Sequence, residues 1–295
     1  RGEIEMSSDL RIVLAGSVSS SRRVLRALLR NRANVVGVLG LSTECAGNVS
    51  GYTRLDDVAM ANNIPYFEFK NINEPHIIHR IHQWNPDLFF VVGLSQLVKQ
   101  DLLDIPRLGC VGFHPTWLPE GRGRAPVAWL VLDGRPGAAT FFLMDAGIDS
   151  GPILVQEPFH VSDHDYASDV VEKLEDAIDR ALDRWLPSLL KGEWNPQPQN
   201  DELASYNGRR SPGDGLIDWY KPAKDICRLI RAASRPHPGA YTYAKNEKLI
   251  VWRAEVENSL QIRGVVGQVL RISGDQGWLV QTGNGLLWLT ETEFV

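Results

Sequence analysis

Short apolar runs that alternate with helical segments dominate the first two thirds of the chain. The runs that read as buried strands lie at residues 11–16, 35–42, 66–69 and 87–95. The segments with helical spacing lie at residues 21–31, 53–65 and 75–86. Strands and helices in alternation form parallel sheets, because each helix carries the chain back across a face of the sheet. We therefore predict a Rossmann-like α/β domain with a mainly parallel sheet, which continues through 109–115 and 138–145 and is followed by a long helix at 166–192.

A polar, proline-bearing stretch separates this region from a different pattern. Residues 192–205 show no periodicity, whereas 223–234 have one apolar helical face, and five short strands with turn signals between them follow. Short strands at regular spacing are typical of small β-barrels. The sequence predicts a Rossmann-like domain over residues 1–195, a linker over 196–205, and a helix plus an OB-like β-barrel over 206–295.

Charge and composition argue against several classes of partner. The formal net charge is −5 and the pI is about 5.8, which disfavours a protein that binds the phosphate backbone of a nucleic acid. No apolar run reaches the roughly 20 residues of a membrane span. The three cysteines match no zinc or disulfide spacing, and the turn after the first strand lacks the glycine pattern of dinucleotide sites. We expect a cytoplasmic protein with no metal, no membrane association and no nucleic-acid partner.

A histidine stands where an apolar strand ends. His114 follows "CVGF", and open α/β sheets bind ligands at the carboxyl edge of their strands. The loop after it, "PTWLPEGRGRAP", holds prolines that fix the backbone, glycines that let a ligand come close, and the cations Arg122 and Arg124. A lone histidine in this position more often has a structural role. The composition of the loop after it is what favours a catalytic role.

A second loop supplies two carboxylates. The run "TFFLMD" leads into Asp145 and Asp149, four residues apart in a glycine-punctuated turn. Either residue alone reads as a turn former. A carboxylate beside a histidine orients the imidazole, however, and the two together make an acid–base unit. The sequence therefore suggests a pairing of His114 with Asp149.

The two loops together resemble a known family. "FHPTWLPEGRGRAP" and "MDAGIDSGPIL" are similar to the N10-formyltetrahydrofolate-dependent formyltransferases, whose pattern is Asn-x-His, then Leu-Pro-x-x-Arg-Gly, then Met-Asp-x-Gly-x-Asp-x-Gly. Residues 206–241 resemble the C-terminal region of those members that formylate an amino sugar on a nucleotide carrier. The likeness covers nearly the whole chain from about residue 11, and three motifs in one order are highly specific.

The resemblance implies a reaction and two sets of contacts. A free amine attacks the formyl carbon of N10-formyltetrahydrofolate, His114 stabilises the oxyanion, and Asp149 keeps the imidazole charged and accepts the proton of the amine. The expected folate contacts are Leu94, Ser95, Gln96, Asp145, Ala146, Gly147 and Ile148. The expected acceptor contacts are Gly112, Arg122, Gly123, Arg124, Arg209 and Arg210. For Arg122 and Arg124, a phosphate contact and a role in bracing the loop both stay open.

One residue departs from the family pattern. Gly112 stands two residues before His114, where the family has an asparagine that helps to hold the oxyanion. The loss of such a donor raises the barrier by roughly 2.7–4 kcal/mol. Either another group supplies the hydrogen bond, with Ser95 and Gln96 as the nearest candidates, or the activity is lost.

The acceptor is predicted from the absence of a basic insertion. The family members that formylate initiator tRNA carry a basic insertion after the second strand, and residues 41–55 here are short and scarcely basic. We therefore predict a sugar N-formyltransferase that acts on a nucleotide-linked amino sugar. The alternatives are a methionyl-tRNA formyltransferase, a formyltetrahydrofolate hydrolase, and a non-catalytic folate- or nucleotide-binding relative. The C-terminal strands leave a homodimer open.

Overall fold

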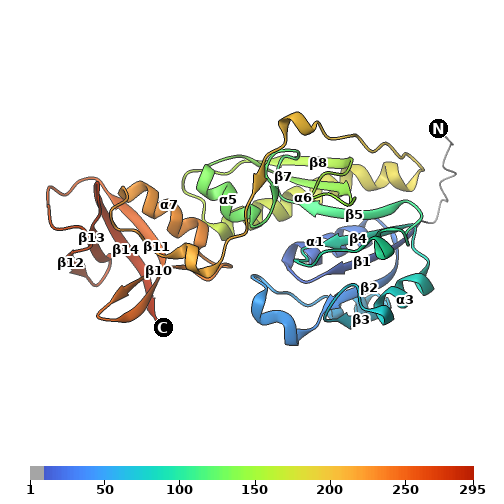
Figure 1. Ribbon diagram of the computed structural model, residues 1–295, viewed down its shortest axis with the longest axis horizontal. Coiled ribbons are helices and arrows are strands. Elements are labelled where there is room, and N and C mark those ends of the chain that lie inside the picture. The colour runs from blue at the N-terminus through green and yellow to red at the C-terminus, as the bar shows by residue number, and fades with distance from the viewer. Residues whose placement is uncertain (1–9) are drawn as a thin grey trace. The chain divides into compact units, whose positions relative to one another are not determined.

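The computed structural model describes residues 10–295, which divide into two compact units (Figure 1). The first unit comprises the described chain up to Gly123, Pro136–His160 and Lys173–Asn207. The second unit comprises Arg124–Arg135, Val161–Glu172 and Gly208–Val295. Each unit is therefore assembled from segments that are far apart in the sequence. The sequence analysis had assigned all of residues 1–195 to one domain, so the first two segments of the second unit are a difference from that expectation.

A seven-stranded sheet forms the centre of the first unit. Its strand order is β3-β2-β1-β4-β5-β7-β8. The strands are β1 (Arg11–Gly16), β2 (Asn34–Leu41), β3 (Tyr66–Phe69), β4 (Leu88–Val92), β5 (Gly109–His114), β7 (Gly137–Leu143) and β8 (Ile153–Phe159). The first five of these run parallel, whereas β7 pairs antiparallel with both β5 and β8. The predicted mainly parallel α/β sheet is confirmed.

Helices cover both faces of this sheet. They are α1 (Ser19–Arg30), α2 (Asp56–Ala61), α3 (Pro75–Trp84), α4 (Gln100–Leu103) and α6 (Ala167–Leu190), with a 3₁₀ turn η1 (Thr43–Asn48) after β2. Successive side chains of a strand point to opposite faces. Phe89 of β4 accordingly packs in one cluster with Ile77 and Ile81 of α3. Phe90, next to it, contacts Trp185 of α6 with ring centroids 6.3 Å apart.

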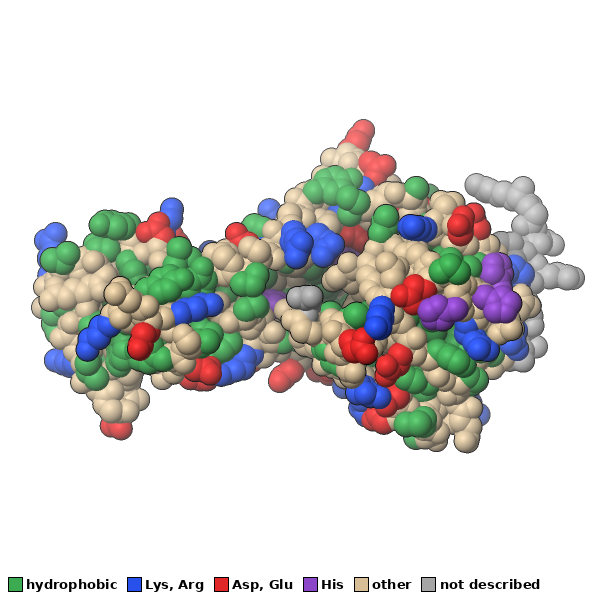
Figure 2. All heavy atoms as spheres, turned by 60° about the horizontal axis from the view of Figure 1, so that its bottom comes forward, with side chains coloured by type: hydrophobic (Ala, Val, Ile, Leu, Met, Phe, Trp, Pro, Cys, Tyr) green, Lys and Arg blue, Asp and Glu red, His purple; other side chains and the backbone are tan. Residues whose placement is uncertain are grey.

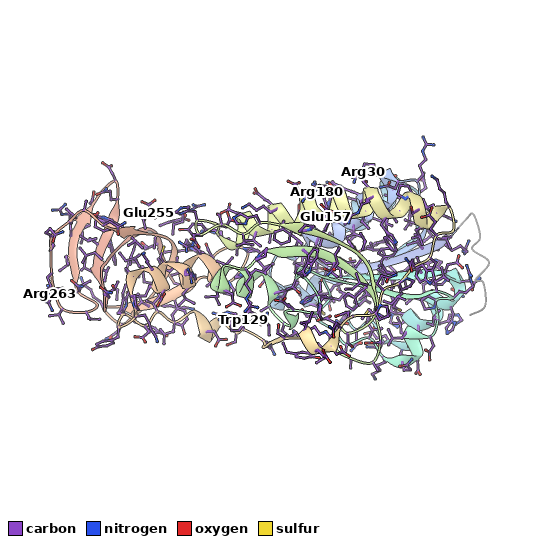
Figure 3. All side chains as sticks on the ribbon, turned by 90° about the horizontal axis from the view of Figure 1, so that it is seen from above. Arg30, Trp129, Glu157, Arg180, Glu255 and Arg263 are labelled. Atoms are coloured by element: carbon purple, nitrogen blue, oxygen red, sulfur yellow. The ribbon has the colours of Figure 1, made fainter. Side chains whose placement is uncertain are left out.

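Ion pairs join the long helix α6 to two other elements of the first unit. Arg30 of α1 reaches Asp179 and Asp183 of α6 at 3.1 and 2.9 Å. Arg180 of α6 reaches Glu157 of β8 at 3.2 Å, and Arg30, Arg180 and Glu157 are labelled in Figure 3. Exposed ion pairs contribute little individually. The arrangement nevertheless places α1 and α6 side by side on one face of the sheet.

The second unit packs helices on an antiparallel sheet. Its sheet has the order β10-β11-β14-β13-β12. The elements are α5 (Pro126–Asp133), η3 (Pro212–Gly215), α7 (Ala223–Ala233), β10 (Ala240–Ala244), β11 (Glu247–Glu257), β12 (Val269–Ser273), β13 (Gly277–Gln281) and β14 (Leu286–Phe294). Ile226 and Ile230 of α7 lie in a buried cluster with Val251 and Leu287 of the sheet. The predicted helix and antiparallel β-domain are confirmed, but over the described residues the sheet is open at β10 and β12 rather than closed into a barrel.

Residues 10–295 contain neither a membrane-spanning helix nor a cluster of metal-ligating side chains. No helix in that range is long and apolar enough to cross a membrane. No group of three or more His, Cys, Asp or Glu side chains in the same range is placed to hold a metal ion.

Candidate active site

His114 lies at the carboxyl end of β5 and is held from both sides of its ring. The side chain is buried, and Nε2 lies 2.8 Å from the carbonyl oxygen of Gly121. Nδ1 lies 3.5 Å from Oδ2 of Asp149. Both ring nitrogens thus face oxygen atoms of neighbouring residues. The structure therefore brings together the two residues that the sequence analysis paired.

Asp149 is the more accessible member of this pair. Its side chain is 21% exposed, against 6% for that of His114. Oδ2 accepts a hydrogen bond of 2.8 Å from the backbone N–H of Gly123. The 3.5 Å separation from His114 is longer than a direct N–H···O bond, and contacts of this kind commonly tighten when substrate binds. A reacting group from solvent would meet the carboxylate before the imidazole.

The turn that carries Asp149 is built from its own side chains. Oδ1 of Asp145 accepts from the N–H of Gly147 at 2.9 Å and from Oγ of Ser150 at 2.8 Å. Position 151 has to be glycine, because a Cβ there would lie 1.7 Å from the carbonyl oxygen of Leu143. Asp145 is thus the turn former that its sequence context suggested. Ala146, Gly147 and Ile148 are exposed on the same turn, and their contact with folate stays a prediction.

Arg122, expected to meet a phosphate or to brace the loop, is only 1% exposed. Its guanidinium donates to Oε1 of Gln199 at 2.9 Å, to Oδ1 of Asp201 at 2.7 Å and to the hydroxyl of Tyr206 at 3.0 Å. Burial alone would lower the pKa of Arg122. The hydrogen bonds to Asp201 and Tyr206 outweigh this effect, so the pKa is raised. Because these donors are already used within the first unit, the geometry fits a bracing role and not a phosphate contact.

Two glycines near the pair are closely approached by neighbouring residues. Gly123 has a φ of +110°, and a Cβ there would lie 2.4 Å from the carbonyl oxygen of Asn207. At Gly112 a Cβ would lie 2.7 Å from the ring of Phe142 and 2.9 Å from Cγ of Met144. The space that an asparagine would need at position 112 is therefore filled by apolar side chains.

Gln96, one of the two residues after β4 expected to replace the missing asparagine, already has partners for its side-chain amide. Oε1 of Gln96 accepts from the N–H of Ile72, and its Nε2 donates to the carbonyl oxygen of Lys70, both at 2.7 Å. These bonds use the amide to join two loops, so Gln96 as an oxyanion donor is a prediction that the geometry does not favour. Ser95 is exposed, and Leu94 packs against the core at the same strand end.

The remaining arginines of the sequence prediction belong to the second unit. Arg124 and Arg209 are exposed there, and the guanidinium of Arg210 lies 5.3 Å from the ring centroid of Trp129. Nη2 of Arg210 also donates to the carbonyl oxygen of Asp214 at 3.0 Å. None of these three arginines takes part in the described side-chain contacts of His114 and Asp149.

Sequence reasoning missed the segment that backs the site. Residues 196–205, expected to be a linker, pack on the first unit. Gln197 forms a β-bridge with Ile153, and Ser205 accepts from the backbone N–H of Arg122 at 2.9 Å. Two-residue strands continue this contact, since β6 (Arg122–Gly123) pairs in parallel with β9 (Tyr206–Asn207). A polar segment without periodicity gives no local signal of such contacts.

Two family models match nearly all of the described chain. The "Formyl transferase" model matches residues 10–186, and the "Formyl transferase, C-terminal domain" model matches residues 210–294. The chain belongs to the formyltransferase family. It is an enzyme of the class that uses N10-formyltetrahydrofolate as formyl donor, as the resemblance of its two loops implied.

Relatives and solved structures agree with this assignment. A methionyl-tRNA formyltransferase of Syntrophomonas wolfei is 32% identical over 96% of this chain and 91% of its own length. The HypX structure from Aquifex aeolicus in complex with tetrahydrofolic acid has a TM-score of 0.71 at 18% identity, covering 96% of this chain but only 44% of HypX. WlaRD, a sugar 3N-formyl transferase crystallised with dTDP and 5-N-formyl-THF, has a TM-score of 0.68 at 17% identity, over 96% and 97% of the two chains. At such identities the structures establish a shared fold.

Proposed function

We propose that this formyltransferase moves the formyl group of N10-formyltetrahydrofolate to a primary amine, with His114 and Asp149 as its catalytic pair. The observation that carries the proposal is the imidazole held between the carbonyl of Gly121 at 2.8 Å and the carboxylate of Asp149 at 3.5 Å. The two loops that supply these groups are the ones that match the family pattern.

Each group of the pair has its own role in the proposed reaction. The amine nitrogen attacks the formyl carbon, a C–N bond forms, and the formyl oxygen becomes an oxyanion. Asp149 takes the proton from the attacking nitrogen, because it is the exposed member of the pair. The positive charge of the imidazolium of His114 stabilises the oxyanion. When the intermediate collapses, the bond from carbon to N10 of the folate breaks and N10 leaves with the proton that Asp149 carried.

The sequence relatives favour methionyl-tRNA as the acceptor. Besides the Syntrophomonas protein, a methionyl-tRNA formyltransferase of Geobacter sulfurreducens is 29% identical over 97% of this chain. The likeness runs through both units and covers 90% of that relative. These full-length matches support the tRNA alternative more strongly than they support the amino sugar expected from the sequence.

The charge distribution on the first unit favours a nucleotide-linked amino sugar as the second candidate. In place of a basic insertion, the chain after β2 forms the short turn η1, where Glu44 is paired with Lys70. On the face of the first unit drawn in Figure 2, acidic and basic side chains are interspersed. A protein that binds a polynucleotide gains most of its affinity from a continuous basic surface. A cytoplasmic location and a homodimer stay predictions with either acceptor.

A tetrahydrofolate-release assay with two acceptors tests the proposal. The assay supplies 10-formyltetrahydrofolate with either methionyl-tRNA or a panel of nucleotide-linked amino sugars, and the Asp149→Asn variant is the control. The asparagine keeps the shape and can still accept from the N–H of Gly123, but it does not take up the proton. We expect amine-dependent turnover that falls by about 10³-fold in the variant.

The outcomes separate the alternatives. Turnover with only one of the two acceptors assigns the substrate class. Formate release without any amine identifies a hydrolase, and folate binding without chemistry identifies a non-catalytic relative. Either of these last two results would overturn the proposal, as would an Asp149→Asn variant with the wild-type rate.

A further inference from the structure

Residues 197–207, called the strap below, lie behind the loops that carry the catalytic pair. We propose that Gln199 of the strap, backed by the buried Arg122, is a positioning residue that holds the Asp149 carboxylate where it receives the proton. The inference rests on the proposed formyl transfer and deepens it. It gives a function to a segment that looked like a connection between domains.

The side-chain amide of Gln199 joins three groups of the site. Nε2 donates to the carbonyl oxygen of Asp149 at 2.8 Å and to that of Gly151 at 2.7 Å. Oε1 accepts from Nη2 and Nε of Arg122 at 2.9 and 3.2 Å. Carbonyl oxygens only accept and a guanidinium only donates, so the orientation of this amide is fixed by its partners. Both the NH2 group and the oxygen of the Gln199 amide are therefore engaged in hydrogen bonds.

The backbone that Gln199 holds is strained. Asp149 has a φ of +50°, in the left-handed region that residues other than glycine seldom adopt. Such a conformation persists only where the surroundings impose it, and it is typical of functional sites. The two bonds from Gln199 fix the carbonyl of the strained residue and the carbonyl two positions further on. With the backbone of Asp149 held in this way, its carboxylate contacts the N–H of Gly123 and the ring of His114.

The strap also holds the other side of the catalytic pair. Oγ of Ser205 accepts from the N–H of Gly121 at 2.9 Å, and the carbonyl of Gly121 is the group that faces Nε2 of His114. The backbone N–H of Arg122 donates to the carbonyl of Ser205 at 2.9 Å. One segment therefore positions both the loop that meets the imidazole and the turn that carries the carboxylate.

The chemistry of the site explains why a neutral amide is needed at position 199. Arg122 already has a carboxylate partner in Asp201, at 2.7 Å. A glutamate at 199 could still accept from the guanidinium, but its second oxygen would face the carbonyl oxygens of Asp149 and Gly151. These are acceptors too, so attraction would become repulsion. Gln199→Glu therefore keeps Arg122 paired while it releases the turn.

The matched control is Gln197→Ala. Gln197 is in the same strap, but its side-chain amide donates only to Asn195, at 3.2 and 2.7 Å. We expect Gln199→Glu to lower kcat for formyl transfer by about 10- to 100-fold, because a misplacement of about 1 Å costs that much. The KM for the formyl donor should stay within about twofold. Gln197→Ala should leave kcat within about twofold of wild type.

A second readout does not depend on turnover. Hydrogen exchange of the peptide that spans residues 145–152 should quicken by about tenfold in Gln199→Glu, since two hydrogen bonds to this turn are lost. The same peptide should be unchanged in Gln197→Ala. If Gln199→Glu does not fold, Gln199→Met replaces it, with the same expected loss of kcat and faster exchange.

The results distinguish the two proposals. Wild-type kcat together with wild-type exchange in a folded Gln199 variant would overturn the positioning role. A fall in stability with unchanged kcat and a raised KM would also overturn it, because that pattern describes a purely structural residue. A wild-type enzyme without turnover on any acceptor would overturn the proposed function. In that case quicker exchange of residues 145–152 would still support the hold of Gln199 on the turn.

Discussion

The active-site region of the first unit and the core of the second unit are held by contacts of opposite kinds. Around the His114–Asp149 pair, the strap and its loops are joined by hydrogen bonds through a buried guanidinium. In the second unit, α7 packs on the open sheet through aliphatic side chains such as Ile226 and Ile230. Hydrogen bonds are directional, whereas apolar packing mainly removes surface from water. The polar region therefore fixes positions and the apolar region supplies stability, and substitutions in the two should have different consequences.

The largest loss of stability should come from the apolar core of the second unit. Ile230 is fully buried, and Ile230→Ala should lower the free energy of unfolding of this unit by about 3 kcal/mol, since it loses packing and leaves a cavity. Lys224→Ala, at an exposed position of the same helix, should change it by under about 0.5 kcal/mol. Urea unfolding of both variants measures the difference. Equal midpoints would show that α7 does not depend on this cluster.

A smaller loss of stability should follow the removal of the buried guanidinium of Arg122 in the first unit. Arg122→Met should cost about 2 kcal/mol, because Gln199 and Tyr206 lose a charged partner while the exposed Asp201 regains water. Arg124→Met, two residues on and exposed, should lie within about 0.5 kcal/mol of wild type. Chemical denaturation of the two variants side by side tests the contrast. If both arginines are equally dispensable, the polar network is not structural.

The smallest effect should be a pH dependence in the second unit. Burial lowers the pKa of His237, the hydrogen bond to Ala232 opposes that shift, and Arg210 adds to it. Below about pH 6.5 the unfolded chain takes up a proton that the folded state resists, so stability falls as the pH drops through that value. His237→Gln should make the fall between pH 7.5 and 5.5 shallower, by under about 1.4 kcal/mol per pH unit. Thermal melts across this range measure it, and parallel curves would contradict the assignment.

Local patterns predicted much of the fold and the two central residues of the site. The runs at 11–16 and 87–95 gave β1 and β4, because apolar residues in sequence report burial on both faces of a sheet. The same reasoning placed His114 at the end of a strand. The pairing with Asp149 followed from two loops whose motifs occur together.

The contacts that sequence reasoning missed join residues far apart in the chain. Gln199 meets Arg122 from 77 positions away, inside a stretch that has no periodicity to reveal it. Gln96 looked like an oxyanion donor, but it is occupied by the carbonyl of Lys70 and the N–H of Ile72. No helix was predicted over residues 124–135, which contain α5 and belong to the second unit.

The way the second unit is assembled has a consequence for swapping parts between members of the family. Helix α5 comes from the middle of the chain, yet it packs against α7, and Tyr166 bonds Ala254 at 3.3 Å from another early segment. A chimera cut once after Asn207 would therefore pair a foreign C-terminal segment with native α5 and native Tyr166. An exchange of the whole second unit therefore has to replace residues 124–135, 161–172 and 208–295 together.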